Sequence, residues 1–242
     1  MPGAPQRLGA PRGYFELTFN GSEYVDTFKS FSHAPEEQMH ASFSTPRYRD
    51  WAQTLVNWVD AYGASRADIL PPVSLNDLGD VNMITRADLA GGTWLAVNVW
   101  NGAQDTIVTA AINDGEEFTL TRTQAGEGEA KLRSIEASDP YAMIRQPSDT
   151  ARAMQSATGK DGYEVFQGGR QQAMVPGPMD SWLWANSSIH LWTADLPADL
   201  PAGIHALTVT ALDHHGREYT HTMAFEVVET IPDMGWQEAF WE

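Results

Sequence analysis

Histidine is the residue type best placed for metal or acid–base chemistry in this sequence. Imidazole binds transition metals and titrates near neutral pH. Of the seven histidines, five lie within or beside one candidate hairpin near the C-terminus. These five are His190, His205, His214, His215 and His221. The pairing of the two candidate strands therefore decides whether any of the five side chains meet.

A two-residue loop, His214-His215, predicts that His205 and His221 project from opposite faces of the hairpin, so that they cannot share a metal ion. A slip of one residue would put them on one face, but still not directly opposite each other. His214 and His215 are adjacent, which makes a shared ion awkward. We therefore expect surface or hydrogen-bonded histidines, and no cofactor or metal in this chain.

No nucleophile motif accompanies these histidines. The sequence contains no Gly-x-Ser-x-Gly, and Ser187-Ser188 before His190 shows adjacency rather than a triad. Cysteine is absent, which excludes disulfides and thiolate chemistry. The pairs Gly91-Gly92 and Gly168-Gly169 lack the lysine and the flanking strand and helix of a phosphate-binding loop. The chain is expected to be non-catalytic by itself, and a hydrolase site within residues 124–186 is the least favoured reading.

Tryptophan indicates a different chemistry, because β-sandwich modules stack sugars on exposed aromatic rings. Trp94 and Trp100 share the parity of one strand face, and Trp182 and Trp184 share that of another. Inward packing explains this parity equally well, and core packing is the favoured interpretation. Within the predicted sandwich we name Trp182, Trp184 and His190 as candidate binding residues.

The charge balance excludes two classes of partner. Lys and Arg number 15 against 32 Asp and Glu, which gives a formal net charge of -17. Such a field repels phosphate backbones and anionic headgroups, so we expect no nucleic acid partner. The sequence contains no 18-residue apolar run and no signal-peptide core near Met1, so we expect no membrane insertion.

A hairpin over residues 14–28 is predicted near the N-terminus, with Asn20-Gly21 as a type I′ turn. One face of its first strand carries Phe15, Leu17 and Phe19. An isolated hairpin with an apolar face is marginal in water, so this face must be covered. We therefore name these three residues as candidate interface residues.

An amphipathic helix follows Thr45-Pro46, which has the pattern of an N-cap and a first-turn proline. Its apolar stripe consists of Trp51, Leu55, Trp58, Val59 and Tyr62. A stripe at helical spacing favours core packing over a binding surface. Residues 69–89 show no periodicity and are predicted to be a surface linker.

From residue 91 to 229 the pattern predicts a mainly β, antiparallel, immunoglobulin-like or fibronectin-like sandwich. Strands at 93–100, 106–112 and 117–122 are expected to form a three-strand meander. A closing hairpin is expected from the strands at 204–212 and 217–228, with Trp192 in the core beneath the 196–203 loop.

The expected organisation has four parts and one long insertion. A flexible segment over 1–13 precedes a hairpin, helix and linker unit over 14–90, and a tail over 230–242 follows the sandwich. The insertion, at about 124–186, contains a short helix that begins at Ser148.

Three blocks, in order, resemble the C-terminal domain that follows the catalytic domain in a bacterial branch of calcineurin-like metallophosphoesterases. The first covers residues 11–39. The second is LAVNVWNG at 95–102, with Asp114-Gly115 and Asp139-Pro140-Tyr141 behind it. The third comprises HLW at 190–192, LPADL at 196–200, GIH at 203–205 and DHHGR at 213–217. Residues 44–90 and 142–186 show no counterpart.

The resemblance implies a non-catalytic accessory domain that packs against a phosphatase domain and shapes access to it. In the family two divalent metals are held by Asp-x-His, Gly-Asp-x-x-Asp, Gly-Asn-His and late histidine blocks of the catalytic domain. The nearest counterpart here, Gly79-Asp80-Val81-Asn82, lacks the second aspartate. The implied partner is that catalytic domain, in cis or as a separate chain, outside the cytoplasm. The alternative is a free-standing carbohydrate- or protein-binding sandwich.

Overall fold

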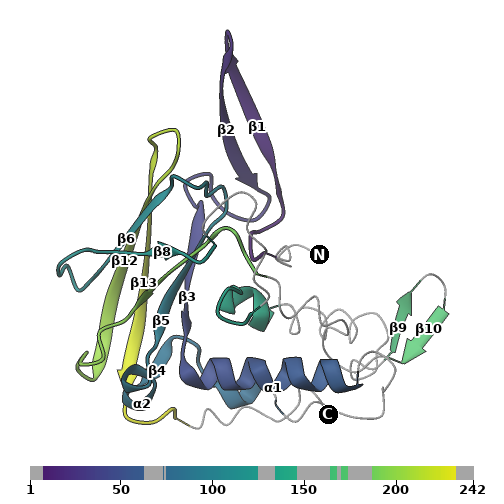
Figure 1. The fold of residues 1–242 in the computed structure, drawn as a ribbon, viewed down its shortest axis with the longest axis vertical. Helices are drawn as coiled ribbons and strands as arrows, with labels where there is room; N and C mark the ends of the chain where they lie inside the picture. The colour runs from purple at the N-terminus through teal and green to yellow at the C-terminus, as the bar shows by residue number, and fades with distance from the viewer. Residues whose placement is uncertain are drawn as a thin grey trace.

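The computed structural model describes residues 8–62, 73, 75–124, 134–145, 164–167, 170–173 and 187–232. Over these residues the chain is mainly β (Figure 1). The elements are β1 Gly13–Asn20, β2 Glu23–Ser30, β3 Met39–Ser44, α1 Pro46–Tyr62, a 3₁₀ turn η2 Leu75–Leu78, β4 Met83–Thr85, α2 Arg86–Ala90, β5 Trp94–Val99, β6 Ile107–Ile112, β7 Phe118–Thr119, β8 Thr121–Arg122, β9 Glu164–Gln167, β10 Arg170–Ala173, β11 Leu191–Asp195, β12 Gly203–Leu212 and β13 Glu218–Val228.

Two sheets pack face to face and form the sandwich. One has the strand order β3-β5-β11-β8 and the other the order β4-β13-β12-β6-β7. Neighbouring strands are antiparallel except for β13 and β4, which are parallel. Buried side chains from both sheets form one hydrophobic cluster, which includes Phe43, Leu95, Trp192, Leu207 and Phe225. The predicted mainly β antiparallel sandwich is confirmed.

Trp192 lies in this core, as predicted, with 2% of its surface exposed. It pairs with Val97 across the β11–β5 ladder. Gly102 touches the edge of its ring, and a Cβ at that position would overlap the indole. Close backbone approach therefore requires glycine there.

The predicted three-strand meander is wrong. β5 belongs to the first sheet and β6 to the second, so the chain crosses from one sheet to the other between residues 99 and 107. β6 pairs with β7, and β8 returns to the first sheet beside β11. Turn residues predict a chain reversal but do not specify which strand becomes the partner.

Residues 75–90 are not a simple surface linker. Met83–Thr85 forms β4 beside β13, and α2 follows with a capping box between Thr85 and Asp88. Ile84 and Leu89 are buried in the sandwich core. A three-residue strand and a five-residue helix are too short to show periodicity in the sequence.

α1 matches the predicted amphipathic helix. The Tyr48 amide donates to Thr45 Oγ1 at 3.0 Å, which is the expected N-cap contact. Trp51 and Leu55 are buried in a second hydrophobic cluster, which also contains Leu78. Core packing is confirmed for these two residues. The side chains of Trp58, Val59 and Tyr62 lie outside the described part of the chain.

The sheets begin before residue 91, because β3 pairs with β5 and β4 pairs with β13. Residues 8–13, predicted to be flexible, are held at both ends. Asn98 Nδ2 of the sandwich donates to the Leu8 carbonyl, and the Phe31 amide, next to the hairpin, donates to the Arg12 carbonyl. Residues 1–7, the proposed helix at Ser148 and the tail from residue 233 lie outside the described residues. Among the described helices none is long and apolar enough to span a membrane.

Candidate functional site

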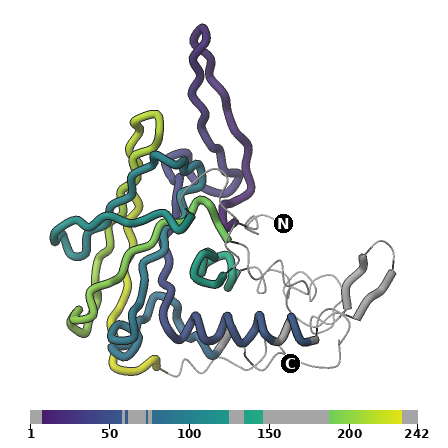
Figure 2. Tube along the Cα trace, in the orientation of Figure 1, coloured from purple at the N-terminus to yellow at the C-terminus, as the bar shows by residue number. Residues whose placement is uncertain are grey.

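The hairpin of β1 and β2 projects beyond the sandwich (Figures 1 and 2). Its loop consists of Gly21 and Ser22, because Asn20 pairs with Glu23. Gly21 has φ +65°, and of the described non-glycine residues just two, Asn113 and Asp114, have a positive φ. The turn is therefore of the II′ pattern, with glycine at the first central position, and not the predicted type I′.

One side of this hairpin is largely apolar, with Asp26 as its charged member. Phe15 is paired with Phe28, Leu17 with Asp26, and Phe19 with Tyr24, so that all six side chains share a face. We define the apolar hairpin face as Phe15, Leu17, Phe19 and Tyr24. Each of these residues is solvent-exposed, with between 51% and 68% of its surface accessible. The predicted sharing of one face by Phe15, Leu17 and Phe19 agrees with this register.

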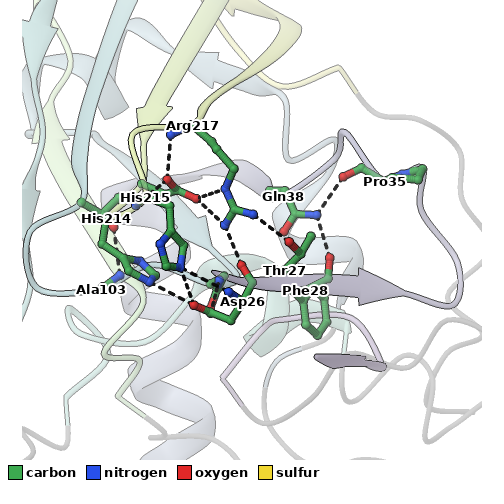
Figure 3. Close-up of polar contacts among 12 residues, drawn as sticks. Asp26, Thr27, Phe28, Pro35, Gln38, Ala103, His214, His215 and Arg217 are labelled. Atoms are coloured by element: carbon green, nitrogen blue, oxygen red, sulfur yellow. Dashed lines mark hydrogen bonds and ion pairs between the residues drawn. The ribbon is translucent and has the colours of Figure 1, made fainter. Parts of the chain in front are cut away.

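Aromatic packing fixes the base of the same face. The rings of Phe15 and Phe28 have centroids 5.4 Å apart, and Phe28 lies edge-on to Trp100 at 6.0 Å. Phe28 and Trp100 are buried. Gln38 adds two hydrogen bonds of 2.9 Å, from its Nε2 to the carbonyls of Phe28 and Pro35 (Figure 3).

Asp26 joins the hairpin to two distant segments (Figure 3). Its Oδ1 lies 2.6 Å from His215 Nε2 and 3.1 Å from His214 Nε2. Its Oδ2 accepts a 2.7 Å hydrogen bond from Asn101 Nδ2. Burial raises the pKa of Asp26, but the hydrogen bonds from His215, Asn101 and His214 outweigh it and hold the pKa well below its usual value. Asp26 is therefore ionised at neutral pH.

A second set of contacts fixes the β12–β13 loop under the hairpin. Arg217 donates from Nε to Asp213 Oδ2 at 2.7 Å, from Nη1 to Thr27 Oγ1 at 2.7 Å and from Nη2 to the Asp26 carbonyl at 2.7 Å. Arg217 Nη2 also forms an ion pair with Asp213 Oδ2, at 2.6 Å. One guanidinium thus bridges both chain segments.

The loop itself differs from the expectation by one residue. The Asp213 amide donates to the Arg217 carbonyl, so the loop has three residues, 214–216, with Gly216 at φ +75°. His221 is consequently opposite Val209, and His205 is opposite Phe225. The prediction that His205 and His221 face opposite sides is wrong, because the longer loop moves β13 by one position. They share the inner face but are not paired, and His205 is held instead by Asn113 and the Pro201 carbonyl.

A second polar cluster surrounds Asp139, beside the N-terminal segment. Asp139 Oδ2 lies 2.8 Å from both His40 Nε2 and Asn98 Nδ2. Trp100 Nε1 donates to His40 Nδ1 at 3.2 Å, so both ring nitrogens of His40 are engaged. An adjoining cavity of about 160 Å³ is lined in part by these rings. A Cβ at Gly9 would overlap Asp139, so the chain passes directly over this cluster. With no free imidazole nitrogen on His40, we interpret the cluster as structural.

His190, a candidate binding residue, has a structural environment. Its Nδ1 donates to the Gly102 carbonyl at 2.9 Å, and its backbone amide donates to Ser188 Oγ. Burial lowers the pKa of His190, an effect that the hydrogen bond to Gly102 partly offsets. The side chain is held in the crossover between the sheets and does not lie in the Asp26 cluster.

The tryptophans of the sandwich differ in exposure, and Trp94 lines a cavity of about 450 Å³ together with Thr121, Thr193 and Asp195. Trp100 and Trp192 are buried. Trp94 is partly buried, and the Arg49 guanidinium lies 4.2 Å from its ring centroid. Trp182 and Trp184, the other two candidates of this type, lie outside the described residues.

Sequence reasoning missed Asp26 as the partner of His214 and His215, and Asn101 as a second partner of Asp26. Asp26 lies in a hairpin 188 residues before His214, and Asn101 belongs to the crossover that was predicted to be a simple turn. Asp213 and Arg217 are four residues apart in the sequence. They can be recognised as an ion pair only once the loop between them is known to have three residues.

Comparison with known families gives a match over residues 1–159 to the family described as the C terminal of calcineurin-like phosphoesterase. The match includes residues 44–90, for which the sequence blocks showed no counterpart. It ends before the third block, at residues 190–217. No curated protein matches the chain.

Proposed function

The chain belongs to the family of C-terminal domains of calcineurin-like phosphoesterases, and from this premise we propose that it is a non-catalytic accessory domain, packing against a metallophosphoesterase catalytic domain and shaping access to it. The observation that carries this proposal is the apolar hairpin face. Phe15, Leu17 and Phe19 are each more than half exposed on a hairpin that projects from the sandwich. An exposed apolar face of this kind is characteristic of an interaction surface.

The base of the hairpin supports the same proposal. Phe28, Asp26 and Thr27 are fixed to the sandwich by aromatic packing and by the Arg217 contacts, so the exposed tip is held in one orientation. A preorganised surface loses less entropy when it binds a partner. The hairpin therefore suits docking to a folded neighbour.

The path of the N-terminal segment is consistent with a neighbour at this end of the molecule. Leu8 and Gly9 lie over the Asn98–Asp139 cluster, and Gly13 begins β1. A catalytic domain attached before this segment would lie beside the hairpin base. A separately encoded catalytic domain would use the same exposed face.

We assign metal-dependent hydrolysis to the catalytic domain, for which the family implies two divalent ions. The Gly79-Asp80-Val81-Asn82 segment forms a turn into β4, in which Asp80 Oδ1 accepts from the Asn82 amide at 2.8 Å. The purified chain alone should not hydrolyse bis-p-nitrophenyl phosphate with added Mn²⁺ or Zn²⁺. Hydrolysis that survives repurification and is lost in His190→Ala would contradict the assignment.

Docking is tested with a calcineurin-like catalytic domain encoded in the same genome, expressed separately and immobilised for binding measurements. We expect Phe15→Ser and Phe19→Ser to weaken association at least tenfold, which is about 1.4 kcal/mol. Thr18→Ser, on the opposite face of the same strand, is the matched control and should bind like the parent chain.

The access role has its own readout. We expect the bound domain to change kcat/KM for a bulky phosphodiester more than for a small one. Equal kcat/KM values with and without the domain would reject the access role while leaving docking in place. Failure of the parent chain to bind any such catalytic domain would reject docking and favour a free-standing binding module.

A further inference from the structure

We propose that Asp26, His214 and His215 form a binding site for one divalent transition-metal ion, which links the base of the N-terminal hairpin to the β12–β13 loop. The three ligand atoms are Asp26 Oδ1 and the Nε2 atoms of both histidines, and all lie within 4.8 Å of one another. This inference rests on these contacts and is independent of the proposed function.

The donor set has the chemistry of a transition-metal site. Two neutral imidazoles and one carboxylate suit Zn²⁺, Co²⁺ or Ni²⁺ better than Ca²⁺ or Mg²⁺, which prefer oxygen ligands. In a tetrahedral site, bonds of about 2.0–2.2 Å place neighbouring ligand atoms roughly 3.3–3.6 Å apart. The observed separations from Asp26 Oδ1 are 3.1 Å to His214 Nε2 and 2.6 Å to His215 Nε2. Small side-chain rotations would therefore open the site for an ion.

The histidine pair is presented by a loop that is fixed without the metal. Asp213 Oδ1 accepts from the amides of His215 at 2.9 Å and Arg217 at 2.8 Å. Gly216 allows the tight return at positive φ. The rings of His214 and His215 lie side by side, with centroids 3.9 Å apart. Both Nε2 atoms therefore converge on one carboxylate oxygen, despite the adjacency of the two residues in the sequence.

Outer contacts orient the carboxylate ligand. Asn101 Nδ2 binds Asp26 Oδ2, which leaves Oδ1 directed at the histidines. Arg217 Nη2 holds the Asp26 backbone carbonyl. In known metal sites, a hydrogen bond to the atom of a ligand side chain that does not bind the metal fixes the orientation of that side chain. The Asp26 amide, 3.3 Å from His215 Nε2, is a longer and weaker competitor for that nitrogen.

The local charge and access also permit a cation. The cationic Arg217 lies near these ligands, and Asp213 pairs with it at 2.6 Å. The three ligand side chains keep between 16% and 26% of their surface exposed, which leaves a route for the ion. The net charge of -17 also raises the local concentration of cations.

The bound ion would act as a cross-link. It would join residues 26 and 215, and so favour the folded hairpin orientation over detached states. Three protein ligands leave one coordination position for water. None of the three ligands belongs to the metal-binding blocks of the catalytic domain.

The test uses the full chain without a polyhistidine tag, stripped of metal with a chelator and then dialysed. Titration with Co²⁺ should produce visible d–d absorption that saturates at one ion per chain. Calorimetric titration with Zn²⁺ should give the same stoichiometry, and Zn²⁺ should raise the melting temperature.

Three variants decide between this site and adventitious binding. We expect Asp26→Asn and His214→Gln each to lower Zn²⁺ affinity at least tenfold and to remove the cobalt spectrum. His33→Gln, an exposed histidine next to the hairpin, is the matched control and should bind like the parent. His214 is in a loop, so His214→Gln should keep the circular dichroism spectrum even if Asp26→Asn loosens the hairpin.

Two results would overturn the proposal. One is the absence of any cobalt spectrum and of any zinc-dependent melting shift in the parent chain. The other is binding by His214→Gln and Asp26→Asn that equals parent binding, because the ion would then be held elsewhere.

Discussion

Asp26 and His215 are 189 residues apart in the sequence, and Asp26 Oδ1 lies 2.6 Å from His215 Nε2. The contact joins the β1–β2 hairpin to the β12–β13 hairpin. Because Asp26 faces Leu17 on the same hairpin, this contact also fixes the orientation of the apolar hairpin face. The orientation of the candidate interface thus depends on the loop between β12 and β13.

Arg217→Met should weaken that connection. Asp213 keeps 3% of its side chain exposed and would lose its charged partner. A charge-assisted hydrogen bond contributes about 1.5–3 kcal/mol, so we expect a loss of about 2 kcal/mol in the free energy of unfolding, measured by urea denaturation with chelator present. The control is Arg86→Met, whose exposed pair with Glu229 should contribute less than about 1 kcal/mol. Equal losses in both variants would contradict the bridging role of Arg217.

Trp192→Ala tests the sandwich core. Truncation of a buried tryptophan costs about 3–5 kcal/mol, because apolar contacts are lost and a cavity remains. Thermal and urea unfolding should both report the loss. Phe19→Ala, at a side chain 68% exposed, should change stability by less than about 0.5 kcal/mol. If Trp192→Ala melts like the parent and instead abolishes ligand binding, the residue is a binding platform.

Stability should fall as the pH drops below about 6.5, the usual histidine value. Burial lowers the folded-state pKa of His190 and of His221. The unfolded chain therefore binds protons at these two histidines more readily than the folded chain. Their contribution to the free energy of unfolding is complete above their unfolded-state pKa. It is lost as the pH falls from that value to their lower folded-state pKa.

The measurement is urea unfolding of the parent, His190→Gln and His221→Gln between pH 5 and 8. Each variant should show a shallower dependence on pH than the parent. Identical slopes in all three proteins would show that these two groups do not contribute.

The isolated chain should self-associate through the apolar hairpin face. Sedimentation velocity over a wide concentration range should show a concentration-dependent increase in mass. The double variant Phe15→Ser and Phe19→Ser should remain monomeric, whereas Thr18→Ser should behave like the parent. A strictly monomeric parent would argue for a self-sufficient binding module.

The local elements of this protein are readable from the sequence alone. Alternation and turn residues predict the β1–β2 and β12–β13 hairpins, and the helical stripe with Thr45 as its cap predicts α1. The buried position of Trp192 was also predicted from the sequence. These features depend on neighbours within a few residues, where periodicity and turn chemistry determine the conformation.

The tertiary structure alone decided which strands pair and which polar groups meet. Alternation tells which side of a strand is apolar, but not that β5 and β6 belong to different sheets, nor that β4 lies beside β13. One extra loop residue placed His205 and His221 on a common face. Asp26 meets His214 and His215 only after the sandwich has brought both hairpins to one edge. Such contacts depend on the packing of the whole core, because no local pattern encodes a partner almost two hundred residues away.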